Sequence, residues 1–203
     1  MTIQEKQTEE KIFEAAKEVF IRKGKDGARM KEIAELAGIN KALLHYYFRT
    51  KERLFDAVFE QIAEIMLGKL APVFDEKLNL EEKVRFFFRE HIAFLQQNPR
   101  LPAFILGEVN RNPERIRKLV GKMNAGAIWS TLIEKHGDEM KRYNITPDTL
   151  PQIMTSMAAL SIFPFAARNI LEVLFEKVDL DFNKYIDQRK EFAADFVIRA
   201  LRK

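Results

Sequence analysis

The chain has 203 residues, of which 47% are hydrophobic, and it carries 34 Lys and Arg against 30 Asp and Glu, a net charge of +4. This composition is typical of a folded protein and excludes a disordered tail. The absence of cysteine excludes a disulfide framework, a thiolate zinc site and a cysteine nucleophile. A cytoplasmic location is expected, because the sequence shows neither a signal peptide nor an apolar run long enough to span a membrane.

The first predicted helix runs from Thr8, an N-cap, to Lys23, and Gly24 ends it. Its apolar residues recur at three- and four-residue spacing, which predicts a buried stripe. This stripe consists of Ile12, Ala15, Ala16, Val19 and Phe20.

Two short helices are predicted next, over 30–37 and 41–48. The first should bury Ile33 and either Leu36 or Ala37. Gly38 supplies the turn between the helices, and Asn40 is the N-cap of the second. Two short helices joined by a glycine-containing turn are the helix-turn-helix pattern.

The rest of the chain shows helical periodicity throughout, with sparse glycine and proline and no alternating strand pattern, so the predicted fold class is all-α. The predicted N-caps are Thr50, Asn112, Thr146 and Asp181. The predicted helices cover 51–74, 81–97, 102–110, 113–136, 147–175 and 182–203. Because no flexible linker is present, a continuous helix should join the two functional regions.

Residues 33–52 read IAELAGINKALLHYYFRTKE. This segment closely resembles the signature of the tetracycline-repressor (TetR) family, approximately I-A-x-x-A-G-V-S-K-G-T-L-Y-H-Y-F-x-x-K-E. The match extends upstream through 12–16 and 20–24. The resemblance implies a three-helix N-terminal helix-turn-helix DNA-binding domain over 1–53 and a larger helical ligand-binding and dimerisation domain over 54–203.

The resemblance also implies that 41–47 is a recognition helix in the major groove and that Lys51 holds a backbone phosphate. Leu44 and Phe48 are interpreted as packing residues. Between Arg22 and Arg53 the chain has nine Lys or Arg against four acids, a surplus larger than that of the whole chain, which favours a DNA partner. The predicted DNA contacts are Arg29, Lys31, Lys41, Ala42, Leu43, His45, Tyr46, Tyr47 and Lys51.

The chain departs from the family signature at three of these positions, which puts the operator sequence in doubt. Arg29 replaces a small hydroxyl residue and could add a phosphate contact. Leu43 replaces a hydroxyl or small residue and could meet a thymine methyl group. His45 replaces a tyrosine and could act either as a neutral donor or as a pH-dependent contact.

The C-terminal region carries more aromatic and methionine side chains than one packing face needs, which favours a pocket for an apolar or aromatic ligand. Ordinary core packing is the alternative for each of them. For His91 and Arg168 the alternative is a structural hydrogen bond or ion pair. The candidate pocket residues are Phe87, Phe88, His91, Phe104, Trp129, Met154, Met157, Phe165 and Arg168.

The last two predicted helices are candidates for a homodimer interface, with an isolated helical core as the alternative. Small residues over 155–161 permit close approach, and the final helix has a broad apolar face. A twofold dimer would present two recognition helices to a palindromic operator. The residues of the apolar face are Phe182, Tyr185, Ile186, Arg189, Phe192, Ala193, Phe196 and Ala200.

An enzyme is disfavoured, because the sequence has no Gly-rich phosphate loop and no Gly-x-Ser-x-Gly motif, and its three histidines are dispersed. No cofactor is expected. His136 and Glu139 have a spacing that could hold a metal, but coincidence is the better interpretation and no metal site is predicted. A helical carrier of hydrophobic ligands is a second alternative, although a carrier needs no basic helix-turn-helix.

The predicted function is therefore a ligand-responsive bacterial transcriptional repressor. A homodimer would bind double-stranded operator DNA and be released by a small hydrophobic or aromatic effector. Activation in place of repression stays open, and so does a ligand that promotes DNA binding.

Overall fold

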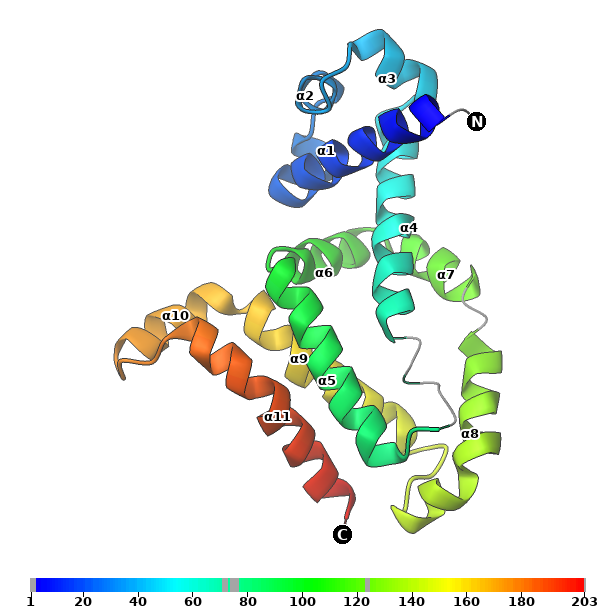
Figure 1. Ribbon diagram of the computed structural model, residues 1–203, viewed down its shortest axis with the longest axis vertical. Coiled ribbons are helices and arrows are strands. Elements are labelled where there is room, and N and C mark those ends of the chain that lie inside the picture. The colour runs from blue at the N-terminus through cyan, green and yellow to red at the C-terminus, as the bar shows by residue number, and fades with distance from the viewer. Residues whose placement is uncertain (1–2, 71–72, 74–76, 123–124, 203) are drawn as a thin grey trace. The chain divides into compact units, whose positions relative to one another are not determined.

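The structure is a computed structural model that describes residues 3–70, 73, 77–122 and 125–202 (Figure 1). Within these ranges every regular element is a helix, from α1 to α11, so the predicted all-α fold is confirmed. The chain divides into two compact units, Met1–Ile65 and Met66–Lys203. The division falls inside α4 (Lys51–Leu70). The functional boundary predicted after Arg53 stays a prediction.

The N-terminal unit is built from α1 (Ile3–Gly27), α2 (Met30–Leu36), α3 (Lys41–Tyr47) and the first part of α4. Every residue of the predicted α1 stripe is buried. The ring of Phe20 meets that of Phe55 on α4 edge to face, with their centroids 4.8 Å apart. Leu36, the last residue of α2, is exposed, and Ala37, which follows it, is buried. Of the two residues that the sequence offered as buried beside Ile33, Ala37 is therefore the one in the core.

Helix α1 begins earlier than the sequence predicted, and Thr8 lies inside it. Residues 3–10 contain neither glycine nor proline and are mostly good helix formers, so nothing forces a start at the threonine. Gly24 does interrupt the helical backbone, with φ 69° and ψ 174°, but the helix resumes as far as Gly27. Gly38, in the turn between α2 and α3, has φ 68°, a conformation that glycine adopts without strain.

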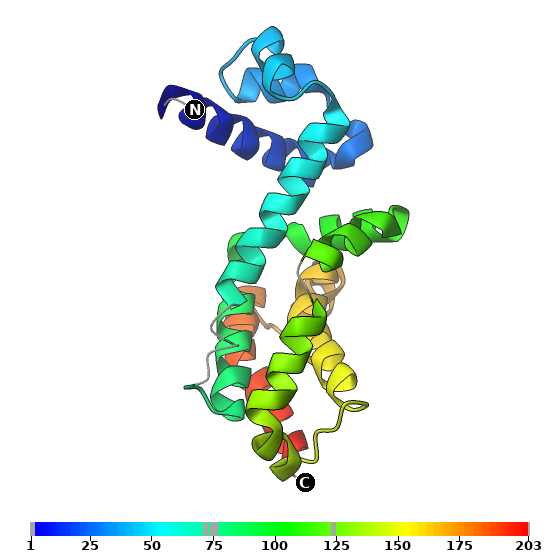
Figure 2. The ribbon, with the colours of Figure 1, turned by 90° about the vertical axis from the view of Figure 1, so that its right-hand side faces the viewer.

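The C-terminal unit contains the rest of α4 and the helices α5 (Leu80–Gln97), α6 (Leu101–Arg111), α7 (Pro113–Lys122), α8 (Ala125–Arg142), α9 (Leu150–Ala166), α10 (Arg168–Glu176) and α11 (Phe182–Leu201). Helices α5, α9 and α11 pack against one another (Figures 1 and 2). The guanidinium group of Arg85 on α5 pairs with Glu191 and Asp195 on α11, at 3.0 and 2.6 Å. The predicted cap of α11 is confirmed, because Asp181 Oδ1 accepts a hydrogen bond from the Lys184 backbone N–H at 2.7 Å.

The helix predicted over 147–175, with Thr146 as its N-cap, is wrong in its extent. Thr146 and Thr149 exchange side-chain-to-backbone hydrogen bonds in a turn before α9. The helix then breaks at Ala167, where φ is −102° and ψ is 19°, and α10 continues at an angle of 69° to α9. Pro164 has no N–H to donate to the Leu160 carbonyl, which weakens the turn before the break. Arg189 of α11 donates to this carbonyl instead, at 3.2 Å.

The helix predicted over 113–136 corresponds to α7 and α8, while 123–124 lie outside the described residues. Its predicted end is wrong, because His136 is a kink inside α8, with φ −117° and ψ 15°. No single helix in the described ranges combines the length and apolar composition of a membrane span. Helices α9 and α10 do so only if they are taken together, across their bend.

Candidate DNA-binding and ligand-binding sites

Helix α3, the predicted recognition helix, is fixed by its N-cap and by side chains on one face. Asn40 Oδ1 accepts a hydrogen bond from the Leu43 backbone N–H at 2.7 Å, which satisfies one of the free N–H groups at the helix start. Leu44 is fully buried. The ring of Phe48, the C-cap residue, lies 5.6 Å from that of Phe13 on α1. The helix is therefore anchored with one face toward the core.

The opposite face of α3 is exposed. Successive residues lie about 100° apart around a helix, so Ala42 and Tyr46 lie opposite Leu44, and Leu43 and His45 lie on either side of them. Tyr46 is 77% exposed and Leu43 is 36% exposed. These side chains contribute little to the core of the unit, and apolar and hydrogen-bonding groups of this kind suit the base edges of a major groove.

Three exposed cations lie close to this face along the sequence. Arg29 immediately precedes α2, Lys31 lies in the first turn of α2, and Lys41 opens α3. Lys31 Nζ is 3.7 Å from a carboxylate oxygen of Glu35, and both side chains are largely exposed. Because such surface pairs contribute little free energy, Lys31 can exchange this partner for a phosphate.

Two cations that the sequence count included in the basic region are paired within the unit. Arg22 Nη2 and Lys23 Nζ lie 2.7 and 2.8 Å from the carboxylate oxygens of Glu32. The hydrogen bond from Lys23, assisted by Arg22, lowers the pKa of Glu32. The count of nine cations therefore overstates the charge available to an anionic partner.

Lys51 has a structural role at the start of α4. Its Nζ donates to the backbone carbonyls of Ala28 at 3.1 Å and Asp26 at 3.3 Å. These bonds tie the beginning of α4 to the connection between α1 and α2. An ammonium group has three N–H donors, so these two carbonyls leave capacity for one further acceptor such as a phosphate oxygen.

The two remaining candidates on α3 differ in exposure. Tyr47 is half-buried, and its ring meets that of Tyr46 edge to face at 5.6 Å. His45 is exposed, and its Nδ1 lies 3.2 Å from the backbone carbonyl oxygen of Arg49. The side chains predicted to contact DNA are thus presented by α3, by the start of α2 with the residue before it, and by the first residue of α4.

Three of the ligand-pocket candidates lie together on α5. The Phe87 ring is 5.3 Å from that of Phe88 and 5.1 Å from that of His91, and the last two residues are buried. His91 Nδ1 is 2.9 Å from Ser161 Oγ on α9, and the Ser161 hydroxyl donates to the Ala158 carbonyl at 3.0 Å. Since a hydroxyl has one hydrogen, His91 Nδ1 must be the donor, which leaves Nε2 as an acceptor.

The other candidates are spread over α6, α8, α9 and α10. Met154 is exposed, and the side chain of Trp129 lies outside the described residues. Arg168 pairs with Glu172 at 2.8 Å, and its guanidinium lies 4.7 Å from the Phe182 ring centroid. Of the remaining candidates, the half-buried ones are Phe104 and Met157, and the buried one is Phe165.

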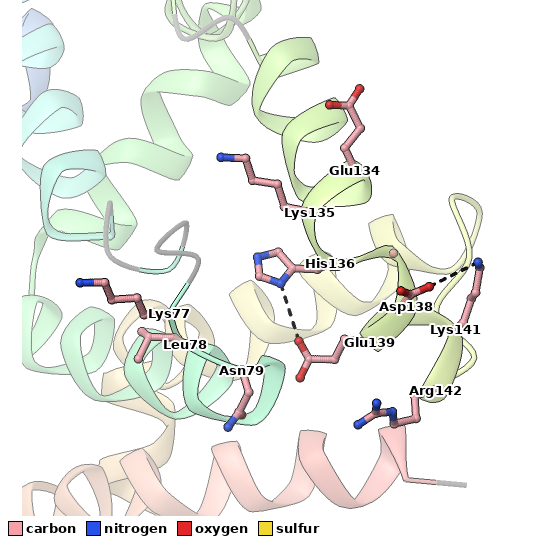
Figure 3. Close-up of a pocket in the computed structure, with 11 residues that line it drawn as sticks. Lys77, Leu78, Asn79, Glu134, Lys135, His136, Asp138, Glu139, Lys141 and Arg142 are labelled. Atoms are coloured by element: carbon pink, nitrogen blue, oxygen red, sulfur yellow. Dashed lines mark ion pairs between the residues drawn. The ribbon is translucent and has the colours of Figure 1, made fainter.

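A polar pocket of about 610 Å³ lies between the start of α5 and helix α8 (Figure 3). Sequence reasoning missed it, because its charged residues come from two distant segments and show no motif. The residues that line it are Lys77, Leu78, Asn79, Glu134, Lys135, His136, Gly137, Asp138, Glu139, Lys141 and Arg142.

The pair of His136 and Glu139 within this pocket has a structural explanation. Glu139 Oε1 accepts a hydrogen bond from the Leu80 backbone N–H at 2.7 Å, so this carboxylate caps α5 from α8. His136 Nδ1 lies 3.7 Å from Glu139 Oε2. Burial and the nearby Lys83 lower the pKa of His136, and Glu139 opposes this effect.

The burial of His91 predicts a specific dependence of stability on pH. Desolvation lowers its pKa from 6.5 to about 4, so the unfolded chain binds this proton more readily than the folded one. Stability should therefore fall as the pH drops from about 6.5 to 4, by about 3 kcal/mol from this group. His91→Asn keeps an N–H donor for Ser161 but does not titrate. Urea unfolding at pH 7.5 and 4.5 should show a smaller loss for the variant, and equal losses would contradict the prediction.

Comparison with known proteins agrees with this arrangement. Residues 12–58 match the family model described as bacterial regulatory proteins, tetR family. The chain is 26% identical over 174 residues to the "Probable HTH-type transcriptional regulator YttP" of Bacillus subtilis, covering 83% of this chain and 82% of that protein. It is 48% identical to the HTH-type transcriptional regulator RutR of Escherichia coli over 59 residues, which are 29% of this chain and 28% of RutR.

Among solved structures, a TetR transcription regulator from Haloarcula marismortui aligns with a TM-score of 0.64 and 18% identity. The alignment covers 96% of this chain and 98% of that one, so the two share a fold along nearly their whole length. The helix-turn-helix geometry, the family match over 12–58 and these relatives lead to one conclusion. Residues 12–58 are a DNA-binding region of the tetR family type, and the whole chain is similar to a transcriptional regulator and shares the fold of a TetR regulator.

Proposed function

We propose that the protein is a ligand-responsive cytoplasmic repressor that binds a palindromic operator as a homodimer. The observation that carries the proposal is the outer face of α3, where Tyr46 is 77% exposed beside Leu43 and His45. A helix fits the major groove, where all base pairs can be distinguished, and the exposed Arg29, Lys31 and Lys41 are suited to phosphates.

Dimerisation through α9 and α11 is supported by apolar side chains that a single chain leaves uncovered. Phe163 on α9 is exposed, as are Phe192 and Phe196 on α11. The last two rings stack with centroids 6.4 Å apart. Large exposed apolar patches typically mark interfaces, and a bundle of two helices from each protomer would cover these rings.

The proposed effector is a small hydrophobic or aromatic molecule bound within the C-terminal unit. The support is the cluster of Phe87, Phe88 and His91 on α5. The ring of His91 is neutral near pH 7 and retains an acceptor at Nε2, which could orient a ligand that carries a hydrogen-bond donor. His91 is therefore the first residue to replace in effector screening.

Signal transmission is proposed to run through α4, which begins at Lys51 in the N-terminal unit and ends in the C-terminal unit. A ligand can shift this helix only if it binds one of the two conformations more tightly. A coupling free energy of about 1–3 kcal/mol would weaken operator binding about 5- to 150-fold. Equal spacing of the two recognition helices in ligand-bound and DNA-bound crystals would contradict this mechanism.

The test of the DNA-binding proposal compares Lys51→Ala with Lys118→Ala, which removes the same charge from an exposed site on α7. If Lys51 contacts a phosphate, its loss should weaken binding about equally on all DNA sequences and reduce the slope of log affinity against log salt by about 1. The control should bind like the wild type.

Thermal unfolding of Lys51→Ala separates the phosphate contact from the loss of its carbonyl bonds within the unit. Binding of each protein to duplex DNA is measured by fluorescence anisotropy over a salt series. An unchanged slope in a folded Lys51→Ala protein would contradict the phosphate role.

A further inference from the structure

The ring of His45 has a defined tautomer on α3. Its Nδ1 is 3.2 Å from the backbone carbonyl oxygen of Arg49, and a carbonyl oxygen can only accept a hydrogen bond. Nδ1 must therefore carry the ring hydrogen. In a neutral imidazole the other nitrogen then has a lone pair and no hydrogen. In that neutral tautomer Nε2 of His45 is a hydrogen-bond acceptor.

The position of His45 on the helix makes this acceptor available. The residue is exposed, and it lies about 100° around the helix from both Leu44 and Tyr46, at the edge of the outer face. Its neighbour one turn earlier, Ala42, has only a methyl group as its side chain. Nδ1 is occupied by the Arg49 carbonyl, so Nε2 is the ring nitrogen left for a partner outside the chain.

An acceptor distinguishes the four bases by their major-groove edges. Adenine presents the N6 amine and cytosine presents the N4 amine as donors. Guanine offers the acceptors N7 and O6, and thymine offers the acceptor O4 and a methyl group. A lone pair on Nε2 would be attracted to an exocyclic amine, whereas it would meet another lone pair at the polar edge groups of guanine or thymine.

We propose that His45 is a specificity-determining residue that selects adenine or cytosine at one position of each operator half-site, by accepting a hydrogen bond at Nε2 from the exocyclic amine. The proposal rests on the proposed DNA-binding function. It assigns Nδ1 the separate task of holding the ring orientation through the Arg49 carbonyl.

The competing explanation is that the His45 side chain only closes the loop after α3, through its bond to Arg49. A loop-closing residue would affect stability and overall affinity, but it would leave base preference unchanged at every position. Replacement by residues of opposite hydrogen-bonding character separates the two explanations. His45→Arg presents donors only, and His45→Ala presents no hydrogen-bonding group.

The experiment is selection from random duplex DNA with the full chain, performed in parallel for the wild type, His45→Arg and His45→Ala, after thermal unfolding has shown that each is folded. The wild type should enrich adenine or cytosine at one position of each half-site. There His45→Arg should enrich guanine, and His45→Ala should show no preference. Replacing that base by guanine should weaken wild-type binding about tenfold per half-site.

Three results would overturn the proposal. Identical base preferences for all three proteins would leave DNA binding intact and reject only the role of His45. Guanine or thymine in the wild-type motif, at the position that the variants alter, would likewise reject only this role. Failure of the wild type to enrich any sequence would reject the DNA-binding function itself, together with this role.

Discussion

Replacing Leu44 by alanine is expected to reduce the stability of the N-terminal unit by about 2–5 kcal/mol, the usual cost of emptying a buried leucine site. Leu44 is fully buried and is the buried residue of α3, so it joins the proposed recognition helix to the unit. Small domains are stable by only about 5–15 kcal/mol in total. We therefore expect loss of operator binding along with the loss of stability.

The neighbouring leucine provides a matched control. Leu43 precedes Leu44 on the same helix but is 36% exposed. Leu43→Ala should change stability by no more than about 0.5 kcal/mol. If the leucine contacts a thymine methyl group, the substitution should also weaken the preference for thymine at that position. Urea unfolding and DNA selection measure the two effects. Equal destabilisation by both substitutions would contradict the orientation of α3.

Placing glutamate at both Phe192 and Phe196 is expected to convert the proposed dimer into a monomer. These rings are 61% and 57% exposed in the single chain and stack on one face of α11. Aromatic residues at the centre of an interface commonly contribute about 2 kcal/mol or more each to the free energy of binding. Unpaired carboxylates buried in the interface would weaken association further. The dissociation constant should rise by roughly a thousandfold or more.

The control for this change is Leu106→Glu, an exposed leucine on α6 in the same unit. It adds one charge at an exposed apolar position on a helix outside the proposed interface, and the protein should stay dimeric. Sedimentation equilibrium of the three proteins, each shown to be folded by circular dichroism, gives their masses. A monomeric wild type at micromolar concentration would contradict the dimer, and a dimeric double variant would contradict this interface.

The features that sequence predicted well depend on residues close together in the chain. Asn40 and Asp181 cap their helices as expected, because a side-chain oxygen three residues before a free N–H suffices. The α1 stripe is buried because a period of 3.6 residues places it on one face. The family signature likewise lies in one continuous segment, 33–52.

The features that sequence missed depend on contacts between distant residues. Glu32 pairs with Arg22 and Lys23 from another helix, which no count of charges reveals. The break after Pro164 is accommodated by Arg189, which donates to the Leu160 carbonyl from α11. The polar pocket likewise forms only where α8 meets the start of α5.

The central claim, that this chain recognises operator DNA through α3 and surrounding cations, is tested most directly by selection from random duplex DNA followed by titration of the recovered site from 50 to 200 mM salt. We expect a palindrome bound by a dimer. If six to ten phosphates are contacted, affinity should fall by about 10³ to 10⁵ over this range. Failure to enrich any sequence, or an affinity that does not change with salt, would contradict the claim.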